Sequence, residues 1–284
     1  ALGILPGSQL DQIAAKRLST VYLPGKKVTM LPNEVIQHFT LAEAVYSPAL
    51  SLYLDVSDDF TVMTRQSKIE MIQVVANLRH DSLEQLFNEE TLRKKIIDYP
   101  FAKELGLLWN FAKKMEALRG KENDINNEKI DYSFLVDGEQ VSIQERRRGS
   151  PIDKVVSELM IYINTEWGKQ LAEEGIAAIY RNQNNGKVKM SLSPAPHQGL
   201  GVSQYAWSSS PMRRYVDLIN QRQLIALLTG TPPPYTKTSH GLMASMHNFE
   251  QIYTTYSEFQ RAMERYWCLR WLIQEKIQQI EGQV

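Results

Sequence analysis

The stretch Ser210–Leu218 (SPMRRYVDL) constrains the fold most, because it predicts where a helix begins and what that beginning presents. Ser210 is a favourable N-cap, and Pro211 fits the first helical position because its missing N–H would be unpaired there anyway. Apolar residues then recur at helical spacing up to Gly230: Leu218, Ile219, Leu224, Ile225 and Leu228. Helix starts offer unpaired N–H groups and partial positive charge, so Arg213 and Arg214 there predict a site shaped for phosphate oxygens.

Hydrophobic periodicity predicts a mixture of helices and hairpins along the rest of the chain. Helical spacing predicts helices over residues 8–20, most of 66–118, 151–174 and about 240–280. Alternation predicts a hairpin over 50–56 and 60–63, a second over 132–141, a short strand over 176–180, and loops over 22–32 and 181–196. Hairpins among dominant helices favour the α+β class over a regular α/β alternation.

Composition bounds the class of protein. The 284 residues suffice for one large domain or two ordinary ones, and Lys+Arg equals Asp+Glu at 32 each. A zero net charge argues against coating nucleic acid by bulk charge, but it allows a local basic channel. The single cysteine, Cys268, excludes a disulfide framework and fits a reducing compartment. No apolar run is long enough to span a membrane, so we expect a cytoplasmic protein with no membrane partner.

Three motifs occur in order around the arginine pair: Pro194–Gly201 (PAPHQGLG), Tyr205-Ala206 and Ser210–Asp217. Together they resemble the C-terminal half of the catalytic domain of the ribonuclease II family, which includes ribonuclease R. Further stretches agree in order with the family pattern: 22–32 (YLPGKKVTMLP), 145–147 followed by 156–160 (VSELM), and 262–265 (AMER). The resemblance therefore covers residues from about 5 to about 275.

The resemblance implies both a fold and an activity. It implies an RNB-type α+β domain with a mixed sheet surrounded by helices, incomplete at its N-terminus, occupying 1–284 as one domain without the flanking oligonucleotide-binding barrels. It implies a monomeric 3′→5′ exoribonuclease that hydrolyses single-stranded RNA with two magnesium ions and releases nucleoside 5′-monophosphates. The alternative is an inactive RNA-binding member of the same family.

The family holds its Mg²⁺ with an aspartate cluster of the form Asp-x5-Asp-x-Asp-Asp, which lies just upstream of the point where this sequence starts. No such cluster occurs in the sequence, so no metal ligand is expected within it. Asp55, Asp58 and Asp59 are the nearest substitute, but aspartate is common in turns for backbone reasons, and we interpret them as a hairpin turn.

Arg213 matches the family's essential arginine, which contacts the scissile phosphate and would stabilise developing charge. Chemistry alone equally allows an ion pair with Asp217, one helical turn away. Arg214 is the weaker candidate, either holding RNA or bonding Asp217. The residues expected to shape the site without touching RNA are Ser210, Pro211, Tyr215, Asp217 and His197, the last bracing a turn rich in glycine and proline.

Other positions are candidate RNA contacts. Tyr22 matches a tyrosine near the 3′-terminal nucleotide, although it equally suits a core position. Glu264 matches a glutamate that would accept bonds from ribose hydroxyls, against a solvated ion pair as the alternative. The basic run Arg146–Arg148 either lines an RNA path or ends a solvated strand. Where the family has base-clamping aromatic residues, this sequence has His80, which can stack, and Asn126, which stacks poorly.

Overall fold

The computed structural model describes residues 1, 3–122 and 130–279, and its α+β class agrees with the sequence prediction. Its strands form four two-stranded antiparallel sheets: β1 (Val21–Leu23) with β2 (Lys26–Val28), β3 (Tyr46–Val56) with β4 (Val62–Gln73), β5 (Ile130–Asp137) with β6 (Gln140–Arg147), and β7 (Tyr180–Asn184) with β8 (Lys187–Ser191). In place of the mixed sheet that the resemblance implied, the described strands form these small antiparallel sheets. Each named strand pairs with the next one across a short turn, so the pairing within these sheets is local.

Helices make up most of the remaining regular structure: α1 (Gln9–Arg17), α2 (Asn33–Phe39), α3 (His80–Leu83), α4 (Glu89–Arg93), α5 (Ala102–Leu118), α6 (Pro151–Glu173), the 3₁₀ turn η2 (Gln198–Leu200), α7 (Tyr215–Thr229) and α8 (His240–Gln274). The start of α6 matches its prediction, since Ser150 Oγ accepts the Asp153 N–H and Pro151 is the first helical residue. None of the described helices is both long enough and apolar enough to cross a membrane.

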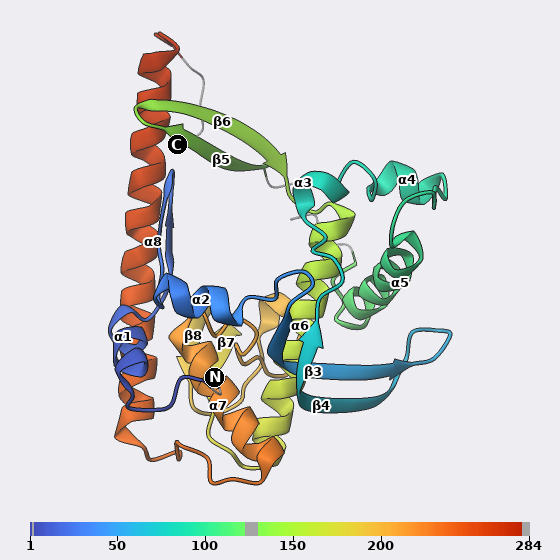
Figure 1. Cartoon of the computed structure of the whole chain (residues 1–284), viewed down its shortest axis with the longest axis vertical. Coiled ribbons are helices and arrows are strands. Elements are labelled where there is room, and N and C mark those ends of the chain that lie inside the picture. Colours follow the sequence, from blue (N-terminus) through green and yellow to red (C-terminus); the bar gives the residue numbers. More distant parts are fainter. Residues whose placement is uncertain (2, 123–129, 280–284) are drawn as a thin grey trace.

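The elements surround the middle of the view in Figure 1. Helix α8 runs along one side, and the β5–β6 hairpin crosses from its C-terminal part towards α3 and α6. At the hairpin tip, Gln274 of α8 bonds both the N–H and the C=O of Val141, at 2.9 and 3.0 Å. Beside it, the β1–β2 turn comes so close that a Cβ on Gly25 would lie 2.8 Å from Val136 Cβ. At the hairpin base, Arg146 pairs with Asp153 of α6.

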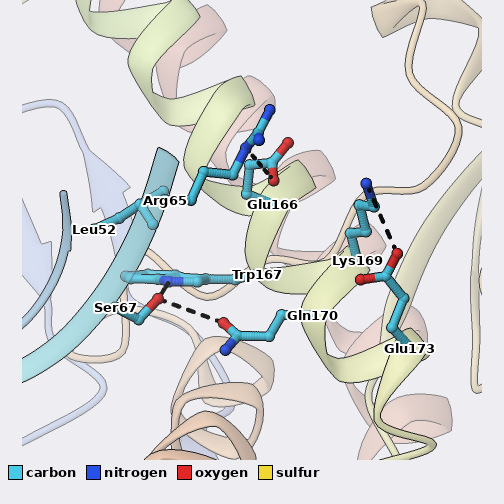
Figure 2. Close-up of a pocket in the computed structure, with 8 residues that line it drawn as sticks. All are labelled: Leu52, Arg65, Ser67, Glu166, Trp167, Lys169, Gln170 and Glu173. Carbon is cyan, nitrogen blue, oxygen red and sulfur yellow. Dashed lines mark hydrogen bonds and ion pairs between the residues drawn. The ribbon is translucent and has the colours of Figure 1, made fainter. Parts of the chain in front are cut away.

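The main core lies where α1, α7 and α8 meet. Its fully buried members include Met30, Leu31, Leu218, Ile219, Leu242 and Phe249. A second cluster joins α5 to α6, and a third packs Trp167 of α6 under the β3–β4 hairpin. Figure 2 shows this last contact, in which the Trp167 indole N–H donates to Ser67 Oγ at 3.1 Å.

Several segments differ from their predictions. Residues 62–73 are a strand although helix was expected from 66, because pairing with apolar β3 outweighs the local pattern. The expected loop 181–196 contains the β7–β8 hairpin, which turns at Asn185-Gly186 with φ values of 51° and 79°, the backbone that an Asn-Gly turn adopts. The expected loop 22–32 likewise contains a short hairpin.

The predicted strand 176–180 contributes only Tyr180 to a strand. The backbone of the preceding residue, Ile179, is hydrogen-bonded to a side chain instead of to a neighbouring strand. Asn220 of α7 accepts the Ile179 N–H and donates to the Ile179 C=O, both at 2.9 Å. This amide satisfies the buried backbone as a neighbouring strand would.

Candidate nucleic-acid interface

The Ser210–Arg214 segment is a turn, and α7 begins only at Tyr215. The prediction that Ser210 caps the helix and that both arginines lie in its first turn is therefore wrong. The backbone here pairs with residues far away in sequence: Thr20 N–H donates to Arg213 C=O at 2.9 Å, and Tyr215 N–H donates to Leu18 C=O at 2.8 Å. This extended pairing holds the arginines outside the helix, which would need the same backbone groups.

Hydrogen bonds to the Ser210 C=O and from the Ser19 hydroxyl stabilise the turn. The Ser210 C=O accepts the N–H groups of Arg213 and Arg214, both at 3.1 Å, and Ser19 Oγ donates to Arg213 C=O. The backbone of Arg213 is therefore fully engaged. Its side chain is exposed, and within the described part of the chain it makes no hydrogen bond or ion pair.

Arg213 lies where three clefts adjoin. The largest, about 850 Å³, is shared with α6 and the β5–β6 hairpin. A cleft of about 150 Å³ is shared with Tyr22 and α8, and one of about 260 Å³ with Tyr22, Lys27 and Pro211. An unpaired guanidinium on a fixed backbone at this junction suits a phosphate oxygen approaching from any of the three.

Arg214 lines the cleft of about 150 Å³ as well, but its guanidinium is paired within the protein. Its Nε and Nη2 donate to the two carboxylate oxygens of Asp217 at 2.7 and 2.8 Å, and its side chain is only 12% exposed. Asp217 is fully buried and also accepts the Ser210 N–H at 2.8 Å. Burial raises the pKa of Asp217, and the Arg214 guanidinium opposes this rise. Of the two readings for Arg214, the structure shows the bond to Asp217.

Among the described residues that line the largest cleft, cations outnumber carboxylates. The four carboxylates of this lining all have cationic partners: Glu116 with Lys154, Glu158 with Arg119, Asp131 with Arg148, and Asp153 with Arg146. Arg213 adds a further cation to the lining. The described lining therefore carries a net positive charge, as a path for a polyanion requires.

Sequence reasoning missed Arg119 and Glu158. Glu158 lies three residues after buried Val155, so a carboxylate occupies a position of the helix's apolar face. That placement was the available signal. Burial raises the pKa of Glu158, and the bonds from Arg119 oppose the rise.

Tyr22 lines one of the smaller clefts, whereas Glu264 lines none of the three and reaches that cleft only through its neighbour Gln260. Tyr22 lines the 150 Å³ cleft from β1, and Gln260 lines it from α8. Gln260 Nε2 donates to Glu264 Oε1 at 2.9 Å. No ion pair of Glu264 occurs among the described residues, so the solvated ion pair considered as its alternative is not seen.

His80 and Arg146 meet at the start of α6. Arg146 Nη2 lies 3.1 Å from His80 Nδ1, and His80 Nε2 lies 3.3 Å from Asp153 Oδ1. Arg146 lines the largest cleft, whereas His80 does not. The side chain of Arg147 and the whole of Asn126 lie outside the described residues.

His197 lies at the turn before η2, where its N–H donates to the Val202 C=O at 3.0 Å. Its ring is 7% exposed and meets the Tyr205 ring edge-on at 5.7 Å. Burial, with a contribution from Arg181, lowers the pKa of His197. It is therefore a neutral, packed histidine at neutral pH, a placement that fits a bracing role.

Comparison with known proteins shows which family this chain belongs to. The model of the RNB domain matches residues 3–191 and 186–230. This chain belongs to the RNB domain family. Exoribonuclease 2 of Vibrio vulnificus is 25% identical over 289 residues, covering 81% of this chain and 43% of that protein.

Solved structures share the fold of this RNB domain. RNase R of Mycoplasma genitalium, in complex with ribose-methylated single-stranded RNA, matches with a TM-score of 0.80 at 18% identity, covering 97% of this chain and 52% of that one. Yeast Ssd1, described as a pseudonuclease, matches with a TM-score of 0.70 at 17% identity, over 92% of this chain and 38% of Ssd1. The chain thus spans about half the length of these relatives, or less.

The described part of this RNB domain does not fit a magnesium site. Across residues 1, 3–122 and 130–279, no three His, Cys, Asp or Glu side chains group as metal ligands. Asp59, one of the candidate aspartates, accepts from Ser57 and Thr61, and these bonds lower its pKa to about 2. This matches the turn interpretation.

The pocket in Figure 2 lies apart from Arg213. Its charged side chains pair with each other, Arg65 with Glu166 at 2.9 Å and Lys169 with Glu173 at 3.7 Å. It shares no lining residue with the three clefts around Arg213.

Proposed function

We propose that this RNB domain is part of a 3′→5′ exoribonuclease that hydrolyses single-stranded RNA. The observation that carries the proposal is the unpaired Arg213 guanidinium, held on a fixed backbone where a positively charged cleft meets two smaller ones. Family membership and the fold shared with an RNA-bound RNase R support it.

Each residue has a role in this proposal. Arg213 binds the scissile phosphate and balances the charge that develops on its oxygens. The Tyr22 ring stacks on the 3′-terminal base, and Glu264 accepts hydrogen bonds from ribose hydroxyls. Arg146 and its neighbours attract the RNA backbone along the largest cleft.

Magnesium would supply an activated water and stabilise the leaving oxygen. The described residues offer no ligand set for it. The proposal further includes release of nucleoside 5′-monophosphates, a monomeric state and a cytoplasmic location.

A time course with a 5′-labelled oligoribonucleotide and magnesium tests the function. We expect a ladder that shortens from the 3′ end. Arg213→Ala should abolish shortening while RNA binding stays largely intact, because one phosphate contact among many is lost. Arg93→Ala, an exposed arginine on α4 that lines none of the three clefts, is the matched control. Loss of binding equal to the loss of hydrolysis in Arg213→Ala would contradict the catalytic role.

The second candidate is an RNA-binding member of the family without hydrolysis. The fold also occurs in Ssd1, a protein described as a pseudonuclease. In the same time course, a stable complex with no shortening would support this candidate.

A further inference from the structure

The Trp207 indole carries two guanidinium groups on its ring. The Cζ atoms of Arg181 and Arg214 each lie 4.0 Å from the ring centroid. Trp207 is 6% exposed, and the rings of Phe249 and Tyr253 meet it edge-on at 6.3 and 5.9 Å. The indole is therefore held from its sides, and both cations rest against a fixed surface.

The indole ring and Asp217 together fix the orientation of the Arg214 guanidinium. The ring constrains the plane of the guanidinium, and the two bonds to Asp217 constrain its rotation within that plane. Asp217 then passes the constraint on, because it also accepts the N–H of Ser210, the first residue of the turn. Ser210 in turn accepts the N–H of Arg213.

Arg181 supports the ring from β7. Its N–H donates to the Tyr205 C=O at 2.7 Å, which joins β7 to the segment that carries Trp207. Within the described residues its side chain pairs with no carboxylate, and burial lowers its pKa, with a smaller contribution from the second cation, Arg214. The negative face of the indole offsets the repulsion between these two cations.

We propose that Trp207, with Arg181 and Arg214, forms a column that fixes the Ser210–Arg214 turn and thereby aims Arg213. Trp207 and Arg214 are positioning residues, and Arg214 does not contact RNA. This inference rests on the proposed role of Arg213 as the phosphate contact.

Arg214→Lys separates positioning from RNA contact, because lysine keeps the charge but cannot make the two-pronged bond or lie flat on the indole. We measure single-turnover shortening and the salt dependence of RNA affinity for the full chain. We expect shortening to slow by about 100-fold, the effect of a small misplacement of a reacting group. RNA affinity and its salt slope should stay as in the wild type. The Arg213→Ala/Arg214→Lys double variant should be no slower than Arg213→Ala, because Arg214 acts through Arg213.

The ring is tested by paired substitutions. Trp207→Leu should slow shortening as Arg214→Lys does, whereas Trp207→Phe, which keeps an aromatic face, should restore most of the rate. Phe87→Leu, at a fully buried aromatic residue of the second core cluster, controls for general loss of packing. If Trp207→Leu does not fold, Arg214→Lys and Trp207→Phe decide the question.

A readout that needs no turnover uses NMR signals of the arginine Nε–Hε groups. Oligouridylate should shift the Arg213 signal in the wild type and Trp207→Phe, but not in Arg214→Lys. A wild-type rate in Arg214→Lys, or slower shortening explained by a smaller salt slope, would overturn the column. A wild-type rate in Arg213→Ala would instead refute the proposed function itself.

Discussion

Adjacent arginines at the Ser210–Arg214 turn have opposite surroundings. The backbone of Arg213 is hydrogen-bonded to Thr20 and Ser210, and its side chain is exposed. The side chain of Arg214 is instead hydrogen-bonded to Asp217. A polar side chain can bind a ligand only when the groups around it are hydrogen-bonded to one another and not to that side chain. Arg213 meets that condition among the described residues, and Arg214 does not.

His197 predicts a pH dependence of stability. Its pKa is lowered in the folded chain, so below the ordinary value of 6.5 the proton binds the unfolded chain more tightly. The free energy of unfolding should therefore fall as the pH drops through 6.5 towards the lower folded value. Urea unfolding from pH 7.5 to 5 should show this slope, and His197→Asn should flatten it.

His240→Asn, an exposed histidine at the start of α8, serves as the control and should keep the wild-type slope. An unchanged slope in His197→Asn would show that other groups cause the dependence.

At the scale of residues, the sequence allows candidate residues to be chosen, but the contacts that their side chains make are harder to predict. The sequence predicts the pairing of Arg214 with Asp217 as one of two outcomes, because the two residues are three positions apart in the chain. The contact of Arg214 with Trp207 was not foreseen, because the ring's orientation depends on α8, which supplies Phe249 and Tyr253 from far along the chain.

At the scale of elements, the β5–β6 hairpin stands out because it is attached at both ends. Its base is tied to α6 through Arg146, and its tip to α8 through Gln274. An isolated two-stranded hairpin is marginally stable in water. These end contacts therefore carry its stability.

Gln274→Ala should loosen the hairpin tip. The variant removes both bonds to Val141, so the amides near residues 136–142 should exchange with deuterium faster, while α6 keeps its protection. Hydrogen-exchange mass spectrometry measures this. Gln251→Ala, an exposed glutamine on the same helix, is the control, and equal exchange in both variants would contradict the role of Gln274.

Elements with strong local signals were predictable, and those set by distant partners were not. Helix α6 begins at Pro151 as expected, and the β5–β6 hairpin turns at Gly138-Glu139, one residue after the predicted Asp137-Gly138, because capping and turn chemistry are local. The start of α7 was misplaced because the Leu18–Thr20 segment competes for the backbone that a helix would need.

At the scale of the whole molecule, the buried pair Arg119–Glu158 ties three segments together. Arg119 follows α5, Glu158 lies on α6, and Arg119 also donates to the C=O of Leu200 in η2. The two side chains are 13% and 5% exposed, so removing one partner leaves a buried charge without its counterpart.

Arg119→Met should lower the free energy of unfolding by about 3–5 kcal/mol, the cost of breaking a buried pair. Adding Glu158→Gln should recover part of that loss, because the stranded charge is gone. Lys94→Met breaks the exposed Glu90–Lys94 pair and should cost about 0–1 kcal/mol. Urea denaturation of the four proteins tests this, and a loss in Arg119→Met no larger than in Lys94→Met would contradict it.

The α+β class was predictable at this scale, because hairpin and helix signals both exist locally. The clefts were not. They arise where residues 19–22, the Arg213 turn, α6 and α8 converge, and no local pattern records that convergence.

The hydrogen bond from the Ser19 hydroxyl to the Arg213 C=O spans 194 positions of sequence. During synthesis the N-terminal segment leaves the ribosome long before its partner exists. The helices and hairpins form locally in the meantime, but the turn that presents Arg213 has no template until the later segment arrives. A growing chain therefore carries basic side chains without an aimed arginine.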